Sequence, residues 1–147
     1  GTKIMDLVNP TKKMSKTEEN PKGVIGLLDN LDDVRKKIMS ATTDSSCEIK
    51  YDPENKPGIS NLINICVSLS DMSIQEVEEK FKNSNYGEFK RFTADIVCDK
   101  LSAIQKKYNE IINSDELDKI LKQGAIKVNE LAHNKYMDMR YKIGLYK

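Results

Sequence analysis

Apolar side chains recur at intervals of three and four residues along most of the chain after residue 30, which is the spacing of one buried helix face. This spacing predicts helices over about residues 31–41 and 59–70, from 73, from after Gly87 to about 112, and from 114–117 onward. The residues expected to face the core in the first four are Leu31, Val34, Ile38, Ala41, Ile59, Leu62, Ile63, Cys66, Leu69, Ile74, Val77, Phe81, Phe89, Phe92, Ile96, Val97, Leu101, Ile104, Tyr108 and Ile111. The stripe of the last helix contains Leu117, Ile120, Leu121, Ala125, Val128, Leu131 and Ala132.

Polar residues mark where these helices begin. Asp29 or Asn30 can cap the first helix, and Ser73 and Glu76 have the spacing of a capping box. Residues 44–58, in contrast, combine two prolines with a glycine, two serines and other polar side chains. They predict the longest irregular connection of the chain, and connections of that length tend to be functional.

The first 28 residues lack the helical pattern. Residues 2–8 tolerate β structure and predict an extended strand that leads into a loop, and residues 23–28 form a short apolar run that also fits an extended segment. Turn signals at 9–12 and at Glu18-Glu19-Asn20-Pro21 bracket the loop, because proline disfavours helix just before it. Since strand patterns are absent after residue 28, the predicted fold class is all-α, a helical bundle with a short extended lead-in.

Composition narrows the possible functions. The 147 residues suffice for one domain with a core, and 32% of them are charged, with a net charge of +1. Such a balance argues against strong non-specific binding to nucleic acid such as DNA, but permits a small patch for one structured RNA. No apolar run approaches the roughly 18 residues of a membrane span, so no membrane partner is expected. The separated cysteines Cys47, Cys66 and Cys98 indicate reduced thiols, with the last two buried, and no zinc site.

One short segment carries chemistry of its own. Lys13 and Lys16 stand three residues apart, with one hydroxyl between them at Ser15 and another after them at Thr17. Lysine amines are compact, flexible point charges, and hydroxyls can donate to phosphate oxygens, so the segment predicts a mobile loop that grips a polyphosphate. An amine aimed at a departing pyrophosphate stabilises the transition state more than the ground state and so raises the rate. Short motifs also match by chance, so a solvated surface turn is the alternative.

Residues 13–17 read K-M-S-K-T, which resembles the K-M-S-K-S loop of class I aminoacyl-tRNA synthetases. Thr17 replaces the final serine and keeps a hydroxyl. The flanking sequence at 1–17, 35–38 with Ala41, 43–45, 51–62 and 86–90 resembles segments of bacterial tryptophanyl-tRNA synthetases. The block Y-D-P-E-N-K-P-G-I-S-N-L at 51–62 is the most distinctive and favours the tryptophan enzymes over the tyrosine enzymes. The resemblance covers essentially the whole chain.

This resemblance implies a parent protein that activates tryptophan with Mg²⁺-ATP and transfers it to tRNA(Trp). It implies that Lys13 and Lys16 act catalytically on the leaving pyrophosphate, and that no metal site belongs to this chain itself. The ATP-binding residues implied by it are Ile4, through its backbone, with Lys13, Met14, Ser15, Lys16 and Thr17. The candidate tRNA contacts are Arg35, Lys36 and Lys56.

The resemblance also implies a domain organisation. Residues 1–22 would end a nucleotide-binding domain, and 23–147 would form a helical C-terminal domain that reads the anticodon region. Family members place an H-I-G-H-like motif, the tryptophan pocket and most of an α/β Rossmann-like domain upstream, whereas the one histidine here is His133. We therefore expect the C-terminal portion of a longer cytoplasmic, homodimeric synthetase, inactive in catalysis by itself.

Other interpretations stay open at this point. The chain could be a free-standing helical RNA-binding module with a vestigial loop, or a helical protein-interaction domain. Arg35, Lys36 and Lys37 also fit a solvated helix face. Lys56 and Asn61, which flank Pro57-Gly58, fit a structurally fixed turn at a helix start as well as a phosphate or RNA contact.

Overall fold

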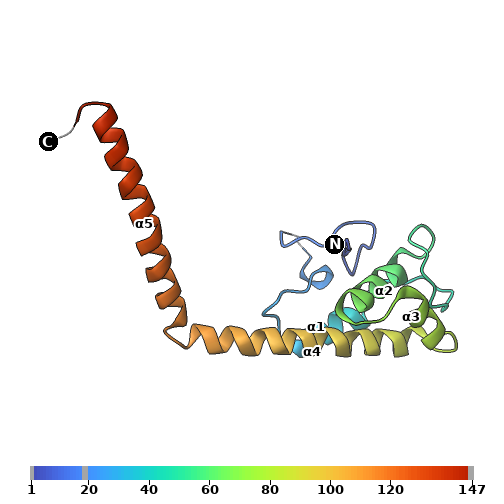
Figure 1. Ribbon diagram of the computed structural model, residues 1–147. Coiled ribbons are helices and arrows are strands. Elements are labelled where there is room, and N and C mark those ends of the chain that lie inside the picture. Colours follow the sequence, from blue (N-terminus) through green and yellow to red (C-terminus); the bar gives the residue numbers. More distant parts are fainter. Residues whose placement is uncertain (1, 18–19, 146–147) are drawn as a thin grey trace. The chain divides into compact units, whose positions relative to one another are not determined.

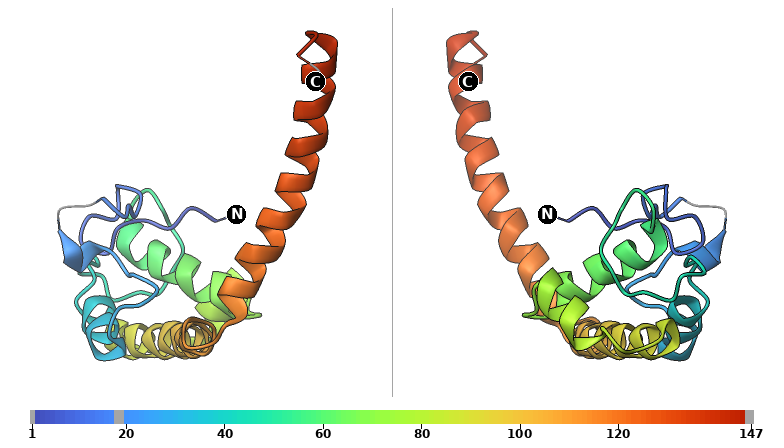
Figure 2. Two further views of the ribbon diagram at one scale, coloured as in Figure 1. Left: turned by 90° about the vertical axis from the view of Figure 1, so that its left-hand side faces the viewer. Right: turned by 90° about the vertical axis from the view of Figure 1, so that its right-hand side faces the viewer.

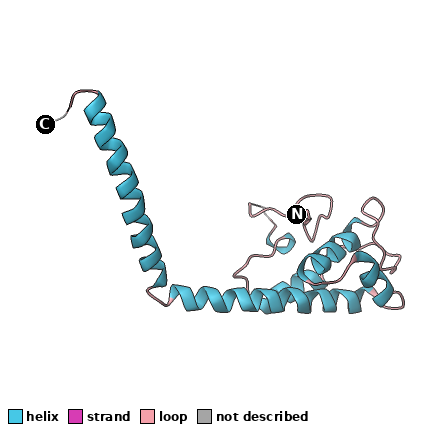
Figure 3. Ribbon diagram, viewed as in Figure 1, coloured by secondary structure: helices cyan, strands magenta, loops and turns pink. Residues whose placement is uncertain are grey.

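The computed structural model describes residues 2–17 and 20–145. These residues form five α-helices and one short 3₁₀ helix, and no named strand occurs among them (Figures 1 and 3). The helices are η1 (Pro21–Gly23), α1 (Leu31–Met39), α2 (Pro57–Leu69), α3 (Ile74–Lys80), α4 (Tyr86–Ile112) and α5 (Glu116–Lys142). The all-α fold class is therefore confirmed. The chain divides into two compact units, residues 1–105 and 106–147. Gly1, Glu18 and Glu19, which belong to the resemblance and the second turn signal, lie outside the described residues.

The helix starts follow the polar residues of the sequence. Asn30 caps α1, and its side chain accepts hydrogen bonds from the backbone of Asp32 and Asp33. Asp29, the other candidate cap, instead pairs with Lys37 and accepts from the backbone of Gly26. The capping box of Ser73 and Glu76 opens α3 as predicted. The second helix begins at Pro57, slightly before the predicted start, because proline fits the first helical turn.

The core of the 1–105 unit lies between α1, α2, α3 and the first part of α4 (Figures 1 and 2). The rings of Phe81, after α3, and Phe89, on α4, meet edge-on with centroids 5.0 Å apart. Cys66 and Cys98 are buried free thiols, as predicted. Twelve of the twenty positions predicted to face the core in the first four helices are buried: Val34, Ile38, Ala41, Ile59, Leu62, Ile63, Cys66, Val77, Phe81, Phe89, Val97 and Leu101.

The predicted stripes extend beyond the observed core. On α4 the buried residues end at Leu101, whereas Ile104 and Tyr108 are 46% and 42% exposed. None of the described residues of α5 is buried, although its apolar residues recur at helical spacing. Periodicity identifies an apolar face of a helix, but it does not say whether a neighbour covers that face.

The predicted strand at residues 2–8 was wrong in extent. The segment is extended, but its β pairing is reduced to one antiparallel bridge between Met5 and Lys13. A single bridge arises because the chain turns back at residues 9–12, only a few residues later, and then continues into the loop. No helix in the described part of the chain is long and apolar enough to cross a membrane.

Candidate functional site

The loop begins as the second arm of a tight hairpin. Asp6 N donates to Lys12 O at 2.8 Å, and Met14 N donates to Ile4 O at 3.1 Å, so the start of the K-M-S-K-T segment lies antiparallel to residues 4–6. The reversal is made by Asn9, whose carbonyl accepts from Lys12 N at 3.0 Å. Ile4 and Met14 are thereby neighbours, and the structure brings these two predicted nucleotide-binding residues together.

Asp6 fixes the turn from inside. Its carboxylate is buried and accepts from the backbone N–H of Val8 and Asn9 at 2.8 and 2.7 Å. An added Cβ on Gly23 would overlap the same carboxylate, so only glycine allows the chain leaving the loop to pass this close. Leu7 N also donates to Gly23 O at 3.0 Å. The two ends of the loop are therefore joined at residues 6–7 and 23.

Two further residues attach the hairpin to the helical core. Thr42, which follows α1, donates its backbone N–H to Leu7 O at 2.8 Å and its hydroxyl to Val8 O at 2.7 Å. Asn61, on α2, donates to Met5 O and accepts from Met5 N, both at 2.8 Å. The base of the loop is consequently fixed to α2 and to the segment that follows α1.

The motif side chains divide between solvent and core. Lys13 and Lys16 are exposed, and no described residue forms an ion pair with either amine. The hydroxyls of Ser15 and Thr17 lie 3.1 Å apart, and Thr17 N donates to Ser15 Oγ at 3.4 Å, which folds the segment into a compact turn. Two amines and two hydroxyls on one short exposed turn form a suitable donor set for the oxygens of a polyphosphate.

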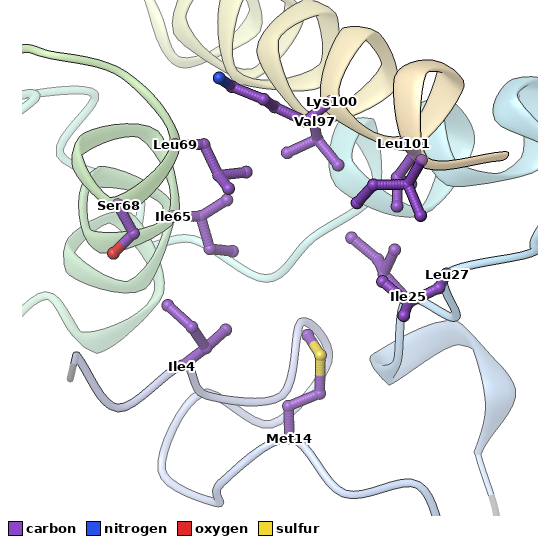
Figure 4. Close-up of a pocket in the computed structure, with 11 residues that line it drawn as sticks. Ile4, Met14, Ile25, Leu27, Ile65, Ser68, Leu69, Val97, Lys100 and Leu101 are labelled. Carbon is purple, nitrogen blue, oxygen red and sulfur yellow. The ribbon is translucent and has the colours of Figure 1, made fainter. Parts of the chain in front are cut away.

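Met14 is the motif residue that turns inward. It lines an apolar pocket of about 310 Å³ in the 1–105 unit, and Figure 4 shows its side chain reaching into this space beside Ile4. The walls are mostly apolar residues of α2 and α4, together with Ile25 and Leu27 from the segment before α1. Ile4 contributes its side chain to the same pocket, so any nucleotide contact made by Ile4 falls to its backbone. The complete lining is Ile4, Met14, Ile25, Leu27, Ile65, Ser68, Leu69, Val97, Lys100, Leu101 and Ile104.

The three predicted tRNA contacts differ in their surroundings. Arg35 pairs with Asp95 of α4, and Lys36 pairs with Asp33 at 3.0 Å, in both cases with well-exposed partners. The Lys56 side chain is only 13% exposed, and its amine lies 3.2 Å from a carboxylate oxygen of Glu48. Lys56 also donates to Ser46 Oγ and to Glu48 O. An RNA contact by Lys56 would therefore compete with internal bonds, whereas Lys36 can reach solvent.

Lys56 belongs to a polar network that fixes the long connection. Tyr86, at the start of α4, donates its hydroxyl to the Asp44 carboxylate at 2.8 Å. Burial raises the pKa of Tyr86 to about 12, and the Asp44 carboxylate adds to this effect. Partial burial opposes ionisation of Asp44, but hydrogen bonds from Ser46 and Tyr86, together with the charge of Lys56, lower its pKa to about 2. These contacts join residues 44–48 of the connection to Lys56, just before α2, and to Tyr86, at the start of α4.

Residues that position the loop were missed in the sequence. Asp6 and Thr42 act through backbone hydrogen bonds, and a single sequence carries no signal for such a role. Asn61 was noticed for its place near a helix start, but its pairing with Met5 joins residues 56 positions apart. No group of three or more His, Cys, Asp or Glu that could hold a metal occurs among residues 2–17 and 20–145.

Comparisons with known proteins converge on one family. Residues 2–102 match a family model described as tRNA synthetases class I (W and Y). The chain is 50% identical to the tryptophan–tRNA ligase of Malacoplasma penetrans over 145 residues, which make up 99% of this chain and 43% of that protein. The Bacillus subtilis tryptophan–tRNA ligase is 46% identical, again over 99% of this chain and 44% of the relative.

The fold gives the same result. A crystal structure of tryptophanyl-tRNA synthetase from Mycoplasma pneumoniae superposes with a TM-score of 0.76 at 31% identity, covering 98% of this chain and 44% of that one. The corresponding structure from Campylobacter jejuni gives a TM-score of 0.75 at 27% identity, over 98% of this chain and 44% of that one. The chain thus spans less than half the length of the relatives that it matches.

Proposed function

The chain belongs to the class I tRNA synthetase family of the tryptophan and tyrosine enzymes, and from that membership we propose that it is the C-terminal portion of a tryptophan–tRNA ligase. Identities of 46–50% to ligases of that name support the tryptophan substrate. The structural feature that carries the proposal is the exposure of the Lys13 and Lys16 amines on a turn whose base is fixed to the core. Such a turn can move while its starting point stays in place.

In this proposal the turn acts during activation of tryptophan by Mg²⁺-ATP. The tryptophan carboxylate attacks the α-phosphorus, the bond to the bridging oxygen breaks, and pyrophosphate leaves with the additional negative charge. Lys13 and Lys16 oppose that charge, and the hydroxyls of Ser15 and Thr17 donate to phosphate oxygens. Because the charge grows in the transition state, these contacts strengthen as the reaction proceeds and increase kcat. Ile4 and Met14 contact the nucleotide through their backbone.

The helical part is assigned to tRNA(Trp). Residues 1–22 complete the nucleotide-binding domain and 23–147 form the tRNA-binding domain, with Arg35, Lys36 and Lys56 as candidate phosphate contacts. The tryptophan pocket belongs to the upstream part of the parent protein, which is a homodimer. Because the aminoacylated product is consumed by translation, the proposed location is the cytoplasm.

The test uses the full-length protein that contains this chain. Lys13→Ala and Lys16→Ala should each lower kcat for tryptophan-dependent ATP–pyrophosphate exchange by roughly 100-fold, the size expected when one preorganised transition-state contact is removed. Lys82→Ala is the matched control, because Lys82 is an exposed lysine that pairs only weakly with Glu79 at 3.7 Å, away from the loop.

Two outcomes would contradict the proposal. If both lysine variants kept full exchange activity, the loop would have no part in activation. If the wild-type full-length protein bound tRNA without exchange activity, the chain would be an RNA-binding module with a vestigial loop. The isolated 147-residue chain should show no exchange.

A further inference from the structure

Met14 differs from the other residues of the loop motif in where its side chain lies. Lys13, Lys16 and Thr17 are exposed, and the half-buried Ser15 hydrogen-bonds within the turn to Thr17, whereas the half-buried Met14 packs against the hydrophobic core. Its backbone N–H is held by Ile4 O at 3.1 Å. The residue between the catalytic candidates is thus the point where the loop is joined to the helical body by apolar contact.

The pocket that receives Met14 has walls from two helices. Ile65 and Leu69 come from α2, and Val97 and Leu101 come from α4 (Figure 4). These helices lie outside the loop and its hairpin, so a movement of Met14 in the pocket would change its packing against both helices. The walls are apolar, and the amine of Lys100 lies at one side of the lining.

The pocket is larger than Met14 requires. Space of about 310 Å³ remains in the pocket beside the Met14 side chain. Methionine is unbranched and polarizable, so it fills irregular gaps in several rotamers at low cost. A thioether in a space of this size and apolarity can change depth without leaving apolar contact.

From these observations, and resting on the function proposed above, the geometry points to Met14 as a positioning residue for activation. Its side chain moves within the pocket as the loop advances to the phosphates, and this contact holds the two lysine amines in register during the movement. In this proposal the free space in the pocket is required, because it lets the Met14 side chain move with the loop. A misplacement of about 1 Å can cost roughly 100-fold in rate, so the side chain that guides the loop can affect kcat without touching ATP.

Substitutions of Met14 and of the pocket wall should have different effects on kcat and stability. Met14→Ala removes the side chain that is guided, and Met14→Leu keeps an apolar side chain of similar size. Leu69→Phe adds volume at the wall and fills part of the space into which Met14 moves. Filling an apolar cavity leaves thermal stability unchanged or raises it, so a lower kcat in this variant would report lost movement and not lost folding.

The experiment measures ATP–pyrophosphate exchange by the full-length synthetase, with kcat, the KM values for ATP and tryptophan, and Tm recorded for each variant. Met14→Ala should lower kcat by about 10-fold or more with an unchanged KM for tryptophan, and Met14→Leu should recover most of the loss. Leu69→Phe should lower kcat by about 5-fold at unchanged or higher Tm. Met72→Ala is the control, because Met72 is another half-buried methionine on the same core that lies outside the pocket lining. It should lower Tm and leave kcat as it is.

The outcomes separate this inference from the proposed function. If the wild type catalyses ATP–pyrophosphate exchange and both Met14→Ala and Leu69→Phe keep its kcat, the Met14 contact in the pocket has no role in activation. The inference is then overturned while the proposed function stands. If Met14→Ala fails to fold, Leu69→Phe and Met14→Leu decide the matter. If the wild type does not exchange at all, the proposed function fails and the inference fails with it.

Discussion

The side-chain amide of Asn61 pairs with both backbone polar groups of Met5, accepting from Met5 N and donating to Met5 O at 2.8 Å each. An amide in this position does for Met5 what a neighbouring strand would do, because it offers one donor and one acceptor at the spacing of a peptide group. Asn61 is only 2% exposed and sits in α2. The segment entering the loop is therefore fixed by a helix side chain in place of a sheet.

Asn61→Asp tests this pairing with almost no change in shape. The carboxylate can still accept from Met5 N, but it places a charged oxygen against Met5 O where a donor is required. We expect a loss of about 2–4 kcal/mol in the free energy of unfolding, since a buried polar group is left without a partner. Chemical denaturation measures it. Asn64→Asp, one turn further along α2, should cost much less because Asn64 is only half-buried. Equal losses in the two variants would contradict the role given to Asn61.

Glycine substitutions on two helices should act in opposite directions. A Cβ added to Gly58, in the first turn of α2, would overlap the backbone carbonyl oxygen of Thr42, whereas one added to Gly124 in α5 meets nothing within 4 Å. Gly58→Ala should destabilise the protein by at least about 1–3 kcal/mol, because a backbone atom must move. Gly124→Ala should stabilise α5 by about 0.5–1 kcal/mol through helix propensity alone. Thermal unfolding followed by circular dichroism would show both, and a tolerated Gly58→Ala would mean that α2 can shift away from Thr42.

Helix positions could be predicted from the sequence because each helix carries its own local signal. The capping box at Ser73 and Glu76 and the stripe of Val34 and Ile38 act within a few residues, and both are found as predicted. The exposure of α5 could not be predicted. A stripe such as that of Leu121 and Val128 shows that a helix has an apolar face, but it does not show whether another element covers that face.

The candidate site divides in the same way. The K-M-S-K-T segment could be recognised, and in the structure its two lysines are exposed and its two hydroxyls lie 3.1 Å apart. The residues that position the turn could not be recognised. Thr42 and Asn61 bond to backbone groups of residues distant in sequence, and Asp6 fixes a turn that has no sequence signature. The inward direction of Met14 likewise depends on helices α2 and α4, which lie many residues away.

The Asp44–Tyr86 pair predicts that the free energy of unfolding falls at both low and high pH. The pKa of Asp44 is about 2, below its ordinary value near 3.9, so its contribution is present above about pH 4 and is lost as the pH falls towards 2. The pKa of Tyr86 is about 12, above its ordinary value near 10, so its contribution is present below about pH 10 and is lost as the pH rises towards 12.

Tyr86→Phe removes the hydroxyl from this pair. It should lower the free energy of unfolding near neutral pH by about 1–3 kcal/mol, since the lost hydrogen bond has a charged acceptor. It should also flatten the stability curve between pH 10 and 12, where the wild type loses the contribution of Tyr86. Urea unfolding at several pH values measures both effects. Tyr108→Phe, on an exposed tyrosine of the same helix, is the control. An unchanged alkaline edge in Tyr86→Phe would show that other groups produce it.

The candidate tRNA contacts make a final prediction, because Lys36 and Lys56 should behave differently when each becomes alanine in the full-length protein. Lys36 is exposed and its ion pair with Asp33 contributes little to stability, so Lys36→Ala should leave Tm unchanged. If it contacts phosphate, its loss should weaken tRNA binding and reduce the slope of log K against log salt by about 0.7–0.9. Lys56 holds Glu48 and Ser46, so Lys56→Ala should lower Tm whether or not it meets RNA. Filter binding of tRNA(Trp) over a salt series, with Tm measured in parallel, separates the two. A Lys36→Ala protein with an unchanged salt slope would remove that residue from the interface, and a Lys56→Ala protein with an unchanged Tm would remove Lys56 from the network that fixes residues 44–56.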